Sequence, residues 1–427
     1  MQIITTNIFR CKEVFVLPVR DGWVDYKLKV VFNKYKPSGK FLAILPSSQM
    51  RYRFRQLFII DTDSNSRTLL TKQEAEVTEI VEWTQDDQVY YISTLPGDPG
   101  ARHLFKLQIG EPSNTCLTCN HQEMIPHLQH RTMCDFASIS MSKDGSYYMM
   151  DCHGPGIPYS CLHHTETNSL LSVWSANNNL EDKFNAVDHA PVQYMEVDVD
   201  GSDQKAQVML YLPPGVEREP GKKWPMLVEV YGGPGFQKVD KQWQGYGYPA
   251  YVAGSLGIVY AVIDPRGSGF QGDAWRHSVY RNFGSVEVSD TVSVTKYLQE
   301  NIDYIDASKT AIWGWSYGGY LSLSSLTKDT SGVFKCGASV APVVKWELYD
   351  TIYTERYMST PQDNPSGYNS STPLWGIENL RNKKYYLIHG THDDNVHYQQ
   401  SMLLSAALEE KDILFRQQTY PDQVSSS

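Results

Sequence analysis

The hexapeptide GWSYGG (residues 314–319) lies between two segments of different character. The apolar run before it, residues 311–313, is typical of a buried strand, and residues 320–326 after it suit a helix rich in small residues. The hexapeptide contains the pattern G-x-S-x-G, in which flanking glycines let a strand and a helix pass close to a strained serine. The stretch therefore predicts a strand, a sharp turn and a helix, with Ser316 presented as a nucleophile. The alternative is a serine in an ordinary strand-to-helix turn.

The chain around this stretch alternates between strand-like and helix-like segments. Almost continuous apolar runs are typical of strands in a parallel sheet that is covered on both faces. Such runs occupy residues 226–233, 257–264, 310–316 and 384–390, and helix-like segments occupy residues 286–301 and 398–411. A hairpin around the turn DGSDQK precedes them. Residues 186–427 are therefore predicted to form an α/β domain with a mostly parallel sheet and helices on both faces.

Two further turns follow predicted strands and carry groups that acyl transfer needs. Tyr231, in the turn YGGPG, is placed to donate its phenol to an oxyanion, while the backbone amide of Tyr317 donates from the nucleophile turn. An ordinary Gly/Pro turn is the alternative for the first of these. Asp393 follows the strand at residues 384–390, where this kind of fold places the acid of a Ser–Asp–His triad, and Asp394 is its competitor.

The first 185 residues contain a loose internal repeat. Each copy has a polar turn, two β-type runs and a Ser/Thr/Asn turn, and the copies occupy residues 36–71, 84–118 and 142–173. This rhythm is typical of propeller blades, and a closed propeller takes roughly four to eight of them. Residues 1–185 are therefore predicted to be the last blades of an incomplete all-β propeller.

The composition excludes some classes of protein. The formal net charge is −10 at pH 7 and no segment clusters Lys and Arg, which argues against nucleic acid as a partner. No apolar stretch approaches the roughly 18 residues of a membrane span, and the N-terminus has no apolar core of a signal peptide. We therefore expect an acidic globular chain without a signal or transmembrane segment of its own.

The cysteines leave several possibilities open. Four of the seven, Cys116, Cys119, Cys134 and Cys152, lie in the region predicted to be all-β. Disulfides are favoured for a protein of the secretory pathway. Zinc bound by Cys116, Cys119 and the nearby His121 is an alternative, and free thiols are another.

Five longer motifs occur in the order found in a known enzyme family. They are VYGGPG (residues 230–235), DPRGSGFQGDAWRH (264–277), GWSYGGY (314–320), VFKCGASVAPVVKWELYDTIYTERYM (333–358) and LIHGTHDDNVHYQQS (387–401). With these motifs the chain resembles the prolyl oligopeptidase family, and specifically its dipeptidyl peptidase IV branch. The resemblance covers the α/β half and, more weakly, the repeats. It implies an α/β hydrolase domain preceded by the last blades of an eight-bladed propeller.

The resemblance also implies an activity. Members of this branch are serine-type dipeptidyl peptidases that release N-terminal Xaa-Pro or Xaa-Ala dipeptides through an acyl-enzyme, without cofactor or metal. By this resemblance Ser316 is the nucleophile and Asp393 the triad acid, and Tyr231 forms the oxyanion hole with the Tyr317 amide.

A substrate pocket is implied in the same way. Proline or alanine at the second substrate position would lie among Tyr349, Tyr353, Trp346, Val343 and Val396. Aromatic faces and small aliphatic side chains suit a flat pyrrolidine ring. Without the resemblance, the spacing of Tyr349 and Tyr353 predicts one face of a helix that packs against a core. Asn395 would hold the carbonyl of the substrate's first residue, and Arg356 would brace the site through ion pairs.

The resemblance further implies how the cysteines pair and where the protein acts. The implied disulfides are Cys116–Cys119 and Cys134–Cys152. Cys11 and Cys336 would pair with cysteines outside this sequence, and Cys161 is left unassigned. Family members are secreted or anchored in the plasma membrane by a type II segment, and full-length forms dimerise. The sequon at Asn369 is a candidate N-glycosylation site that fits this compartment.

The chain departs from the family pattern in two places: the glutamates that bind the substrate amine and the histidine that acts as the catalytic base. The family uses paired propeller glutamates for the amine, but the Glu-Glu pair here, residues 409–410, lies in a helix-like segment. The family's catalytic histidine follows shortly after a tyrosine such as Tyr420, and His397 is the only histidine after Asp393 in this sequence. We therefore expect both ends to be cut and the polypeptide to be nearly inactive, since removing the base costs several orders of magnitude.

Two other hypotheses about the function are compatible with the sequence. One is a non-enzymatic relative that uses the scaffold to bind partners, and the other is a different serine hydrolase, such as an acylaminoacyl peptidase. The enzyme is favoured over the binding protein because Ser316, Tyr231 and Asp393 are all retained.

Overall fold

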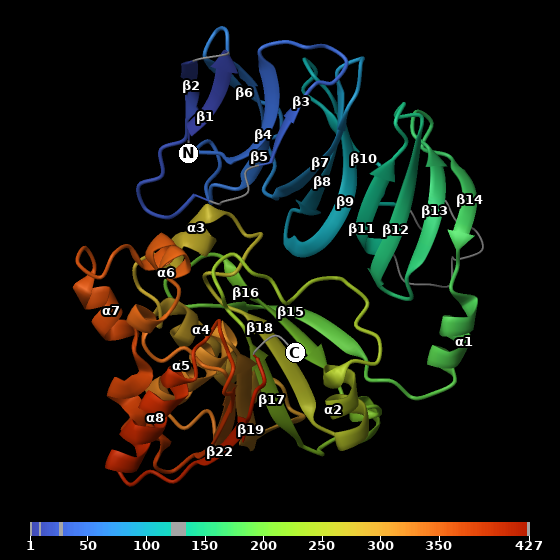
Figure 1. Ribbon diagram of the computed structural model, residues 1–427. Coiled ribbons are helices and arrows are strands. Elements are labelled where there is room, and N and C mark those ends of the chain that lie inside the picture. The colour runs from blue at the N-terminus through green and yellow to red at the C-terminus, as the bar shows by residue number, and fades with distance from the viewer. Residues whose placement is uncertain (1, 8–9, 25–28, 121–133, 425–427) are drawn as a thin grey trace. The chain divides into compact units, whose positions relative to one another are not determined.

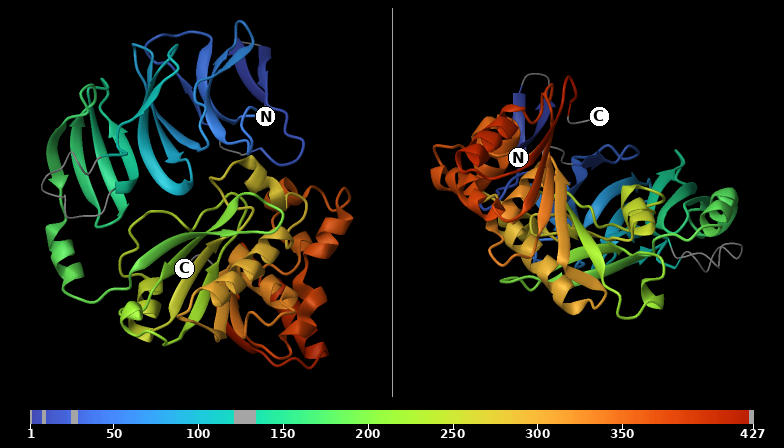
Figure 2. Two further views of the ribbon diagram at one scale, coloured as in Figure 1. Left: turned by 180° about the vertical axis from the view of Figure 1, so that it is seen from behind. Right: turned by 90° about the horizontal axis from the view of Figure 1, so that it is seen from below.

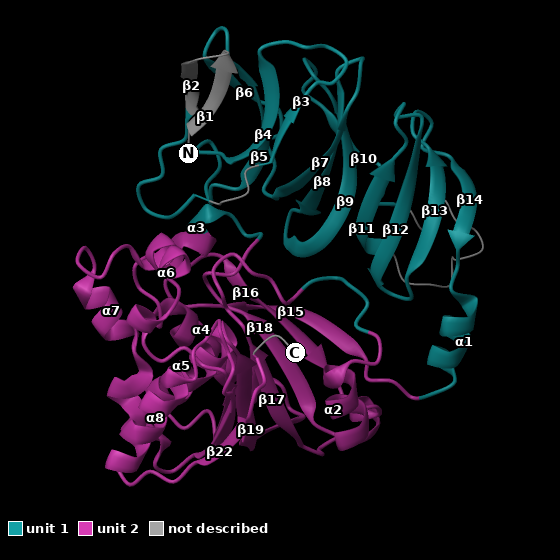
Figure 3. Cartoon of the chain, in the orientation of Figure 1, with its two compact units in different colours: residues 1–187, 240–244, 270–274 teal, residues 188–239, 245–269, 275–427 magenta. Residues whose placement is uncertain are grey.

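The computed structural model describes residues 2–7, 10–24, 29–120 and 134–424. The chain divides into two compact units, shown in Figure 3. Unit 1 contains residues 1–187 and two short segments from later in the sequence, residues 240–244 and 270–274. Unit 2 contains residues 188–239, 245–269 and 275–427.

Unit 1 consists mainly of antiparallel strands (Figure 1). It begins with the hairpin β1 (Gln2–Asn7) and β2 (Arg10–Val16). The first four-stranded sheet comprises β3 (Val30–Phe32), β4 (Lys40–Pro46), β5 (Arg55–Asp61) and β6 (Ser66–Leu69). The second comprises β7 (Val77–Trp83), β8 (Gln88–Leu95), β9 (Asp98–Gln108) and β10 (Asn114–Cys116). The third comprises β11 (Cys134–Met141), β12 (Tyr147–Pro155), β13 (Tyr159–His164) and β14 (Leu170–Ser175), followed by helix α1 (Asn178–Asn185). A parallel pairing of β11 with β9 at Phe136 and Arg102 joins the second and third into one eight-stranded sheet.

These sheets are the predicted blades, with one difference. The first strand of each sheet (β3, β7 and β11) precedes the corresponding repeat copy. The copies begin at the polar turn after that strand because this turn carries the recurring Ser, Asp and Gly residues. The sequence therefore identifies the blades but places the start of each one strand too late.

The middle sheet is buried on both faces, which is how propeller blades pack. Successive side chains of a strand point to opposite faces. In β8, Val89 and Tyr91 pack with Leu42 and Leu57 of the first sheet. Their neighbours Tyr90 and Ile92 join a cluster with side chains of the third sheet. The alternation along β8 thus builds two apolar layers and joins three sheets into one unit.

Both disulfides implied by the resemblance are present. Cys116 pairs with Cys119, and Cys134 on β11 pairs with Cys152 on the neighbouring β12. Among the described side chains, Cys161 and Cys336 are free thiols. His121, the third zinc ligand suggested by the sequence, lies outside the described residues.

A buried carboxyl group lies among charged side chains in unit 1. Glu76 Oε1 accepts a hydrogen bond from the Gly272 amide at 2.7 Å, and Glu76 Oε2 is 4.0 Å from Arg55 Nε. Arg55 Nε is also 3.4 Å from Asp273 Oδ1. The pKa of Glu76 is raised to about 7, chiefly by burial and also by the nearby Asp273, and this net rise already includes the opposing effects of Arg55, Arg102 and the Gly272 amide. The folded state therefore holds a proton on Glu76 that the unfolded state releases at lower pH.

This proton makes the stability of unit 1 depend on pH. Because the folded pKa lies above the unfolded one, the free energy of unfolding falls as pH rises from about 4.5 to about 7 and then levels off. We expect Glu76→Gln, which mimics the protonated acid, to be at most about 1 kcal/mol more stable than the wild type at pH 5 and roughly 3 kcal/mol more stable at pH 8. Urea unfolding at both pH values measures this difference. Glu79→Gln, an exposed neighbour on β7, is the control. A constant difference between Glu76→Gln and the wild type at all pH values would contradict the account.

Unit 2 contains one mixed sheet in the order β15-β16-β18-β17-β19-β20-β21-β22. Its strands are β15 (Val192–Asp198), β16 (Lys205–Tyr211), β17 (Trp224–Val230), β18 (Val259–Asp264), β19 (Ile305–Trp315), β20 (Cys336–Val340), β21 (Lys384–Gly390) and β22 (Arg416–Tyr420). β15 and β16 pair antiparallel, as do β16 and β18, and the pairs from β18 to β22 are parallel. The sheet is thus mostly parallel, as predicted.

Helices cover this sheet on both sides (Figures 1 and 2). The helices of unit 2 are α2 (Tyr248–Leu256), α4 (Val286–Asn301), α5 (Tyr317–Lys328), α6 (Thr351–Met358), α7 (Pro365–Ser371) and α8 (Gln399–Glu410). The short α3 (Asp273–Arg276) begins in the unit 1 segment 270–274. Val252 and Ala253 of α2 pack on Tyr260 and Val262 of β18. Figure 1 shows α4, α5 and α8 on the other side. This arrangement confirms the predicted α/β architecture. Among the described residues, no helix has the length and apolar composition needed to cross a bilayer.

Candidate active site

The loops that carry the predicted site residues leave the same edge of the sheet. Parallel register pairs Val230 with Gly314, and Trp315 with Val340, so β17, β19 and β20 end side by side. Val340 in turn pairs with Ile388 near the end of β21. Ligands of open α/β sheets bind at this carboxyl edge of the strands. Tyr231, Ser316 and Asp393 follow β17, β19 and β21 at this edge.

Ser316 occupies a strained backbone position between β19 and α5. Its φ of 59° and ψ of −118° lie in a region that side chains other than glycine seldom adopt. The turn is held by hydrogen bonds from the Ser316 amide to Val340 O at 2.9 Å and from the Tyr320 amide to Ser316 O at 3.0 Å. The side chain is half-buried. This is the strand–turn–helix geometry that the sequence predicts for residues 314–319, although α5 begins at Tyr317 rather than at Tyr320.

Glycines make this turn possible. A Cβ on Gly314 would lie 2.3 Å from Gly318 O, and a Cβ on Gly318 would lie 2.2 Å from Val230 O. A Cβ on Gly319 would lie 2.6 Å from Val340 O. Because the obstacles are backbone atoms, no side-chain movement relieves these contacts. The glycines thus let α5 start directly beside the ends of β17 and β20.

The Tyr317 side chain anchors the turn at Ser316 to helix α4. Its ring is buried, and its hydroxyl donates a hydrogen bond to Glu287 Oε1 at 3.2 Å. Glu287 is fully buried on α4 and also accepts from the amides of Gly284 and Ser285. Burial raises the pKa of Glu287 and raises that of Tyr317 well above its usual value. Tyr317, the first residue of α5 after Ser316, is therefore fixed through its side chain.

Tyr231 lies in a tight turn directly after β17. Gly232, with φ of 68°, lies so close to α5 that a Cβ there would be 2.5 Å from Leu321 Cδ2. The Tyr231 ring lies 4.6 Å from the ring of Phe236 and 6.4 Å from that of Tyr317, centroid to centroid. Burial, and then Tyr357, raise the pKa of Tyr231, so its phenol is a hydrogen-bond donor at neutral pH as an ordinary tyrosine is.

Aromatic side chains extend from the nucleophile turn toward α6. Trp346 is buried in the 3-10 helix η5 (Trp346–Leu348), 5.5 Å from the ring of Tyr317. The Tyr353 ring stacks on Trp346 at 6.2 Å, and the Tyr349 ring stands perpendicular to Tyr353 at 5.3 Å. Burial, and then Tyr231, raise the pKa of Tyr349 to about 12. The structure thus brings Tyr231 and the predicted pocket tyrosines together.

The loop after β21 distinguishes Asp393 from Asp394. Asp393 is buried, and its Oδ1 accepts hydrogen bonds from the amides of Asn395 at 3.0 Å and Val396 at 2.9 Å. Its Oδ2 lies 3.1 Å from His389 Nε2. Asp394 is exposed. A carboxylate held in this way has one fixed orientation, which a triad acid requires.

The loop that carries Asp393 (the acid loop, residues 391–398) is hydrogen-bonded to the cluster of Trp346, Tyr349 and Tyr353, which we call the aromatic group. The Tyr349 hydroxyl donates to Asn395 Oδ1 at 2.7 Å. Val396 is fully buried next to Asp393, and Val343 is buried in the segment after β20. Arg356 is half-buried on α6, and its predicted bracing role stays a prediction.

Two residues of this region, His389 and Glu287, are not predicted from the sequence. His389 is buried, with Nδ1 2.7 Å from Ser401 Oγ and Nε2 2.7 Å from Val396 O as well as near Asp393. Nε2 faces Asp393 and Val396 in the loop after β21, and Nδ1 faces Ser401 of α8, so both ring nitrogens have partners and His389 orients Asp393. Glu287 supports Tyr317, as described above. No sequence pattern reveals either role, since His389 lies in a strand and acidic residues are common in the first turn of a helix.

Comparisons with known proteins agree with this geometry. Residues 245–424 match the model of the prolyl oligopeptidase family, and residues 2–159 match that of the dipeptidyl peptidase IV N-terminal region. Venom dipeptidyl peptidase 4 of Vespula vulgaris is 38% identical over 409 residues, which cover 94% of this chain and 51% of the relative. Dipeptidyl peptidase 4 of Bos taurus is 39% identical over 406 residues, covering 94% of this chain and 51% of the relative.

A solved structure has a similar fold. The crystal structure of Porphyromonas gingivalis dipeptidyl peptidase 4 is similar with a TM-score of 0.81 at 27% identity, covering 93% of this chain and 52% of that one. The chain spans about half the length of the curated relatives it matches. Family models that match both units, and relatives that cover most of the chain, lead to one conclusion: the chain belongs to the prolyl oligopeptidase family, in the branch with a dipeptidyl peptidase IV N-terminal region.

Proposed function

We propose that this chain carries the nucleophile, acid and oxyanion donors of a serine-type dipeptidyl peptidase that releases N-terminal Xaa-Pro or Xaa-Ala dipeptides. The observation that carries the proposal is the strained turn at Ser316, which three glycines hold beside Tyr231 and the aromatic group. Backbone strain of this kind concentrates at functional sites.

The proposed reaction starts with attack of Ser316 Oγ on the carbonyl carbon after the second substrate residue. The Tyr231 phenol and the Tyr317 amide stabilise the negative charge that develops on the carbonyl oxygen. A histidine oriented by Asp393 takes the serine proton and passes it to the leaving amine. Water then hydrolyses the acyl-enzyme. After Asp393 the 427 residues contain only His397 as a histidine, so we propose that the polypeptide of this sequence alone is nearly inactive.

The aromatic group supports the proposed specificity. Tyr349, Tyr353 and Trp346, with Val343 and Val396, form the proposed pocket for proline or alanine, and Asn395 is the proposed partner of the first residue's carbonyl. A pyrrolidine ring gains from aromatic faces that a polar side chain cannot use. Arg356 is the proposed brace of this region.

The proposal also covers the location, glycosylation and oligomeric state of the protein. Two disulfides and an exposed Asn369 in its sequon support an extracellular protein, secreted or held at the plasma membrane, with a glycan at Asn369. A homodimer is proposed for the full-length form.

The test uses the product of the complete transcript with two chromogenic amides. Gly-Pro-p-nitroanilide has a free amine, and succinyl-Gly-Pro-p-nitroanilide does not. A dipeptidyl peptidase cleaves the first and spares the second. Equal cleavage of both would indicate an endopeptidase instead, and cleavage of neither would favour the non-enzymatic binding protein.

The proposed pocket gives a prediction about specificity. We expect Tyr353→Ala to lower kcat/KM for Gly-Pro-p-nitroanilide by about 10- to 100-fold, because the variant loses the aromatic face that stacks on Trp346. The loss for Gly-Ala-p-nitroanilide should be smaller, since alanine offers less apolar area. Tyr297→Ala, an exposed tyrosine of α4, is the control. Equal losses for both substrates would remove Tyr353 from the pocket.

A further inference from the structure

Three metal-binding side chains meet in the middle sheet of unit 1. A ring nitrogen of His103 and the sulfur atoms of Cys116 and Cys119 all lie within 4.8 Å of one another. His103 belongs to β9, and Cys116 ends β10, the antiparallel neighbour of β9. Within the described part of the chain, this is the one group of three His, Cys, Asp or Glu side chains brought so close together. All three residues belong to one compact unit, so their arrangement is defined by that unit alone.

The residue types and spacing are those of a zinc site. Two cysteines separated by two residues, together with a histidine, are common zinc ligands. Zinc binds sulfur at about 2.3 Å and nitrogen at about 2.0 Å, so the ligand atoms of a tetrahedral site lie roughly 3.5–3.8 Å apart. Once the S–S bond is broken, the two sulfurs must therefore separate by roughly 1.7 Å from their bonded distance of about 2.0 Å. The His103 nitrogen lies within 4.8 Å of both sulfurs and must approach each by at most about 1.3 Å.

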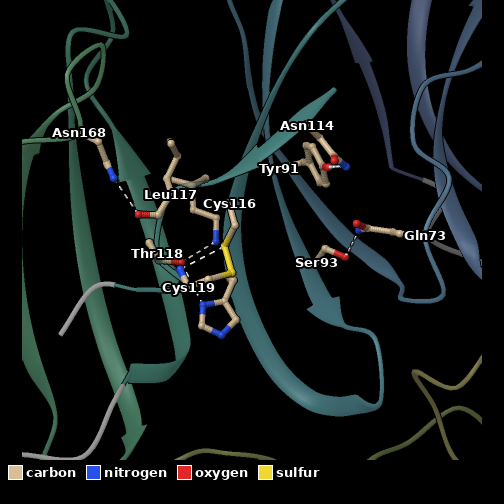
Figure 4. Close-up of a disulfide and its surroundings, with 11 residues drawn as sticks. Gln73, Tyr91, Ser93, Asn114, Cys116, Leu117, Thr118, Cys119 and Asn168 are labelled. Atoms are coloured by element: carbon tan, nitrogen blue, oxygen red, sulfur yellow. Dashed lines mark hydrogen bonds between the residues drawn. A yellow bond between two sulfur atoms is a disulfide. The ribbon is translucent and has the colours of Figure 1, made fainter. Parts of the chain in front are cut away.

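The surroundings already orient these groups. The Cys119 amide donates a hydrogen bond to Cys116 Sγ at 3.1 Å, a contact that stabilises negative charge on sulfur. Thr118 Oγ1 lies 3.1 Å from His103 Nδ1 and accepts from the Leu104 amide at 3.0 Å. Figure 4 shows Thr118 beside the Cys116–Cys119 disulfide.

One ring nitrogen of this histidine lacks the bond that burial requires. His103 is 1% exposed, and its Nε2 has no hydrogen-bond partner among the described residues. Buried polar atoms are nearly always hydrogen-bonded, so each exception calls for a reason. A histidine that binds a metal through one ring nitrogen usually keeps the other nitrogen in a hydrogen bond. A role as a metal ligand would therefore account for the unpaired nitrogen of His103.

The disulfide at this position is more open to reductants than the second one. Cys116 and Cys119 are both half-buried, whereas Cys134 and Cys152 are each 3% exposed. Disulfide exchange and reduction depend on access to the sulfur atoms. A mild reductant should therefore open Cys116–Cys119 first.

We propose that reduction converts the Cys116–Cys119 disulfide into a site that binds one Zn²⁺ through both thiolates and His103. A phosphine supplies the two electrons that break the S–S bond, becomes the phosphine oxide with oxygen from water, and leaves two thiols that carry the two protons of that water. When Zn²⁺ binds, both thiols release their protons to solvent and two Zn–S bonds form. Three protein ligands leave a fourth position for water. His103 thus replaces His121, the third ligand that the sequence suggested.

The experiment titrates the 427-residue chain with Co²⁺ before and after mild reduction by a phosphine. Alkylation and mass spectrometry establish which cysteines have been opened. The reduced chain is expected to bind one equivalent of Co²⁺ with thiolate-to-metal charge-transfer absorption and the visible bands of tetrahedral cobalt, and Zn²⁺ should displace it. The oxidised chain is expected to lack both signals.

Variants separate this site from other thiols. We expect His103→Asn, whose amide can still pair with Thr118, to weaken Zn²⁺ binding at least tenfold, and His164→Asn to leave it unchanged. Cys116→Ser with Cys119→Ser should abolish the cobalt signal while Cys161→Ser keeps it. If the double serine variant fails to fold, as judged by near-ultraviolet circular dichroism, His103→Asn still decides. Absence of the charge-transfer band in the reduced chain, or equal Zn²⁺ affinity in His103→Asn and His164→Asn, would overturn the proposal.

Discussion

Replacing Ser316 with alanine is expected to lower kcat/KM for Gly-Pro-p-nitroanilide by about 10⁴- to 10⁶-fold in the product of the complete transcript. The alanine has no hydroxyl to attack the carbonyl, so the acyl-enzyme cannot form. The oxyanion donors and the pocket remain and leave a small residual rate. KM should change little, because substrate binding depends mainly on other groups.

The control for this variant is Ser289→Ala. Ser289 is an exposed serine of α4 whose hydroxyl bonds back to Val286 O within its own helix. It should retain full activity. A Ser316→Ala enzyme within tenfold of the wild type would show that another residue is the nucleophile, and the proposed mechanism would be wrong.

Replacing Gly318 with alanine is expected to have the largest effect on stability, a loss of about 3 kcal/mol in the free energy of unfolding of unit 2. The added Cβ would lie 2.2 Å from Val230 O and 3.1 Å from Tyr231 Cα. Relief requires that α5 move away from the end of β17. That movement also separates the Ser316 turn from Tyr231, so activity should fall together with stability. Urea unfolding and hydrolysis of Gly-Pro-p-nitroanilide measure the two effects.

Gly254→Ala is the matched control. Gly254 lies in the helix α2, and a Cβ there would meet nothing within 4 Å. Alanine in a helix is more favourable than glycine by roughly 0.5–1 kcal/mol, so this variant should be slightly more stable than the wild type. If Gly318→Ala were as stable as Gly254→Ala, the close packing of the nucleophile turn would not be a constraint on the sequence.

The sequence predicts those elements whose pattern is set by local packing. The predicted strand at residues 384–390 and the helix at 286–301 are β21 and α4 with the same bounds. By contrast, β20 (CGASV) and β22 (RQQTY) lack a long apolar run and were not predicted. They become strands because each pairs with the neighbouring β21 in register. Their structure depends on tertiary pairing rather than on their own residues.

The site residues also divide into those that local sequence predicts and those whose roles depend on tertiary contacts. Ser316 stands out because glycines and a strand–turn–helix pattern surround it, and its backbone has the strained angles that this pattern requires. The contacts of Glu287 and His389 depend on side chains from distant segments: Glu287 supports Tyr317, and His389 supports Asp393. Such contacts arise only when the parallel strands align their ends, so a single sequence carries no signal for them. The catalytic roles of Ser316, Asp393 and Tyr231 stay predictions until they are measured.

We propose Ser316 as the nucleophile of a proline-directed dipeptidyl peptidase. The most direct test of this proposal is the reaction of the product of the complete transcript with a Xaa-Pro diphenyl phosphonate, followed by digestion and mass spectrometry. We expect one phosphonyl group per chain, on the peptide that contains Ser316, and no labelling of the Ser316→Ala variant. A phosphonyl group on another residue, or equal labelling of the variant, would contradict the proposal.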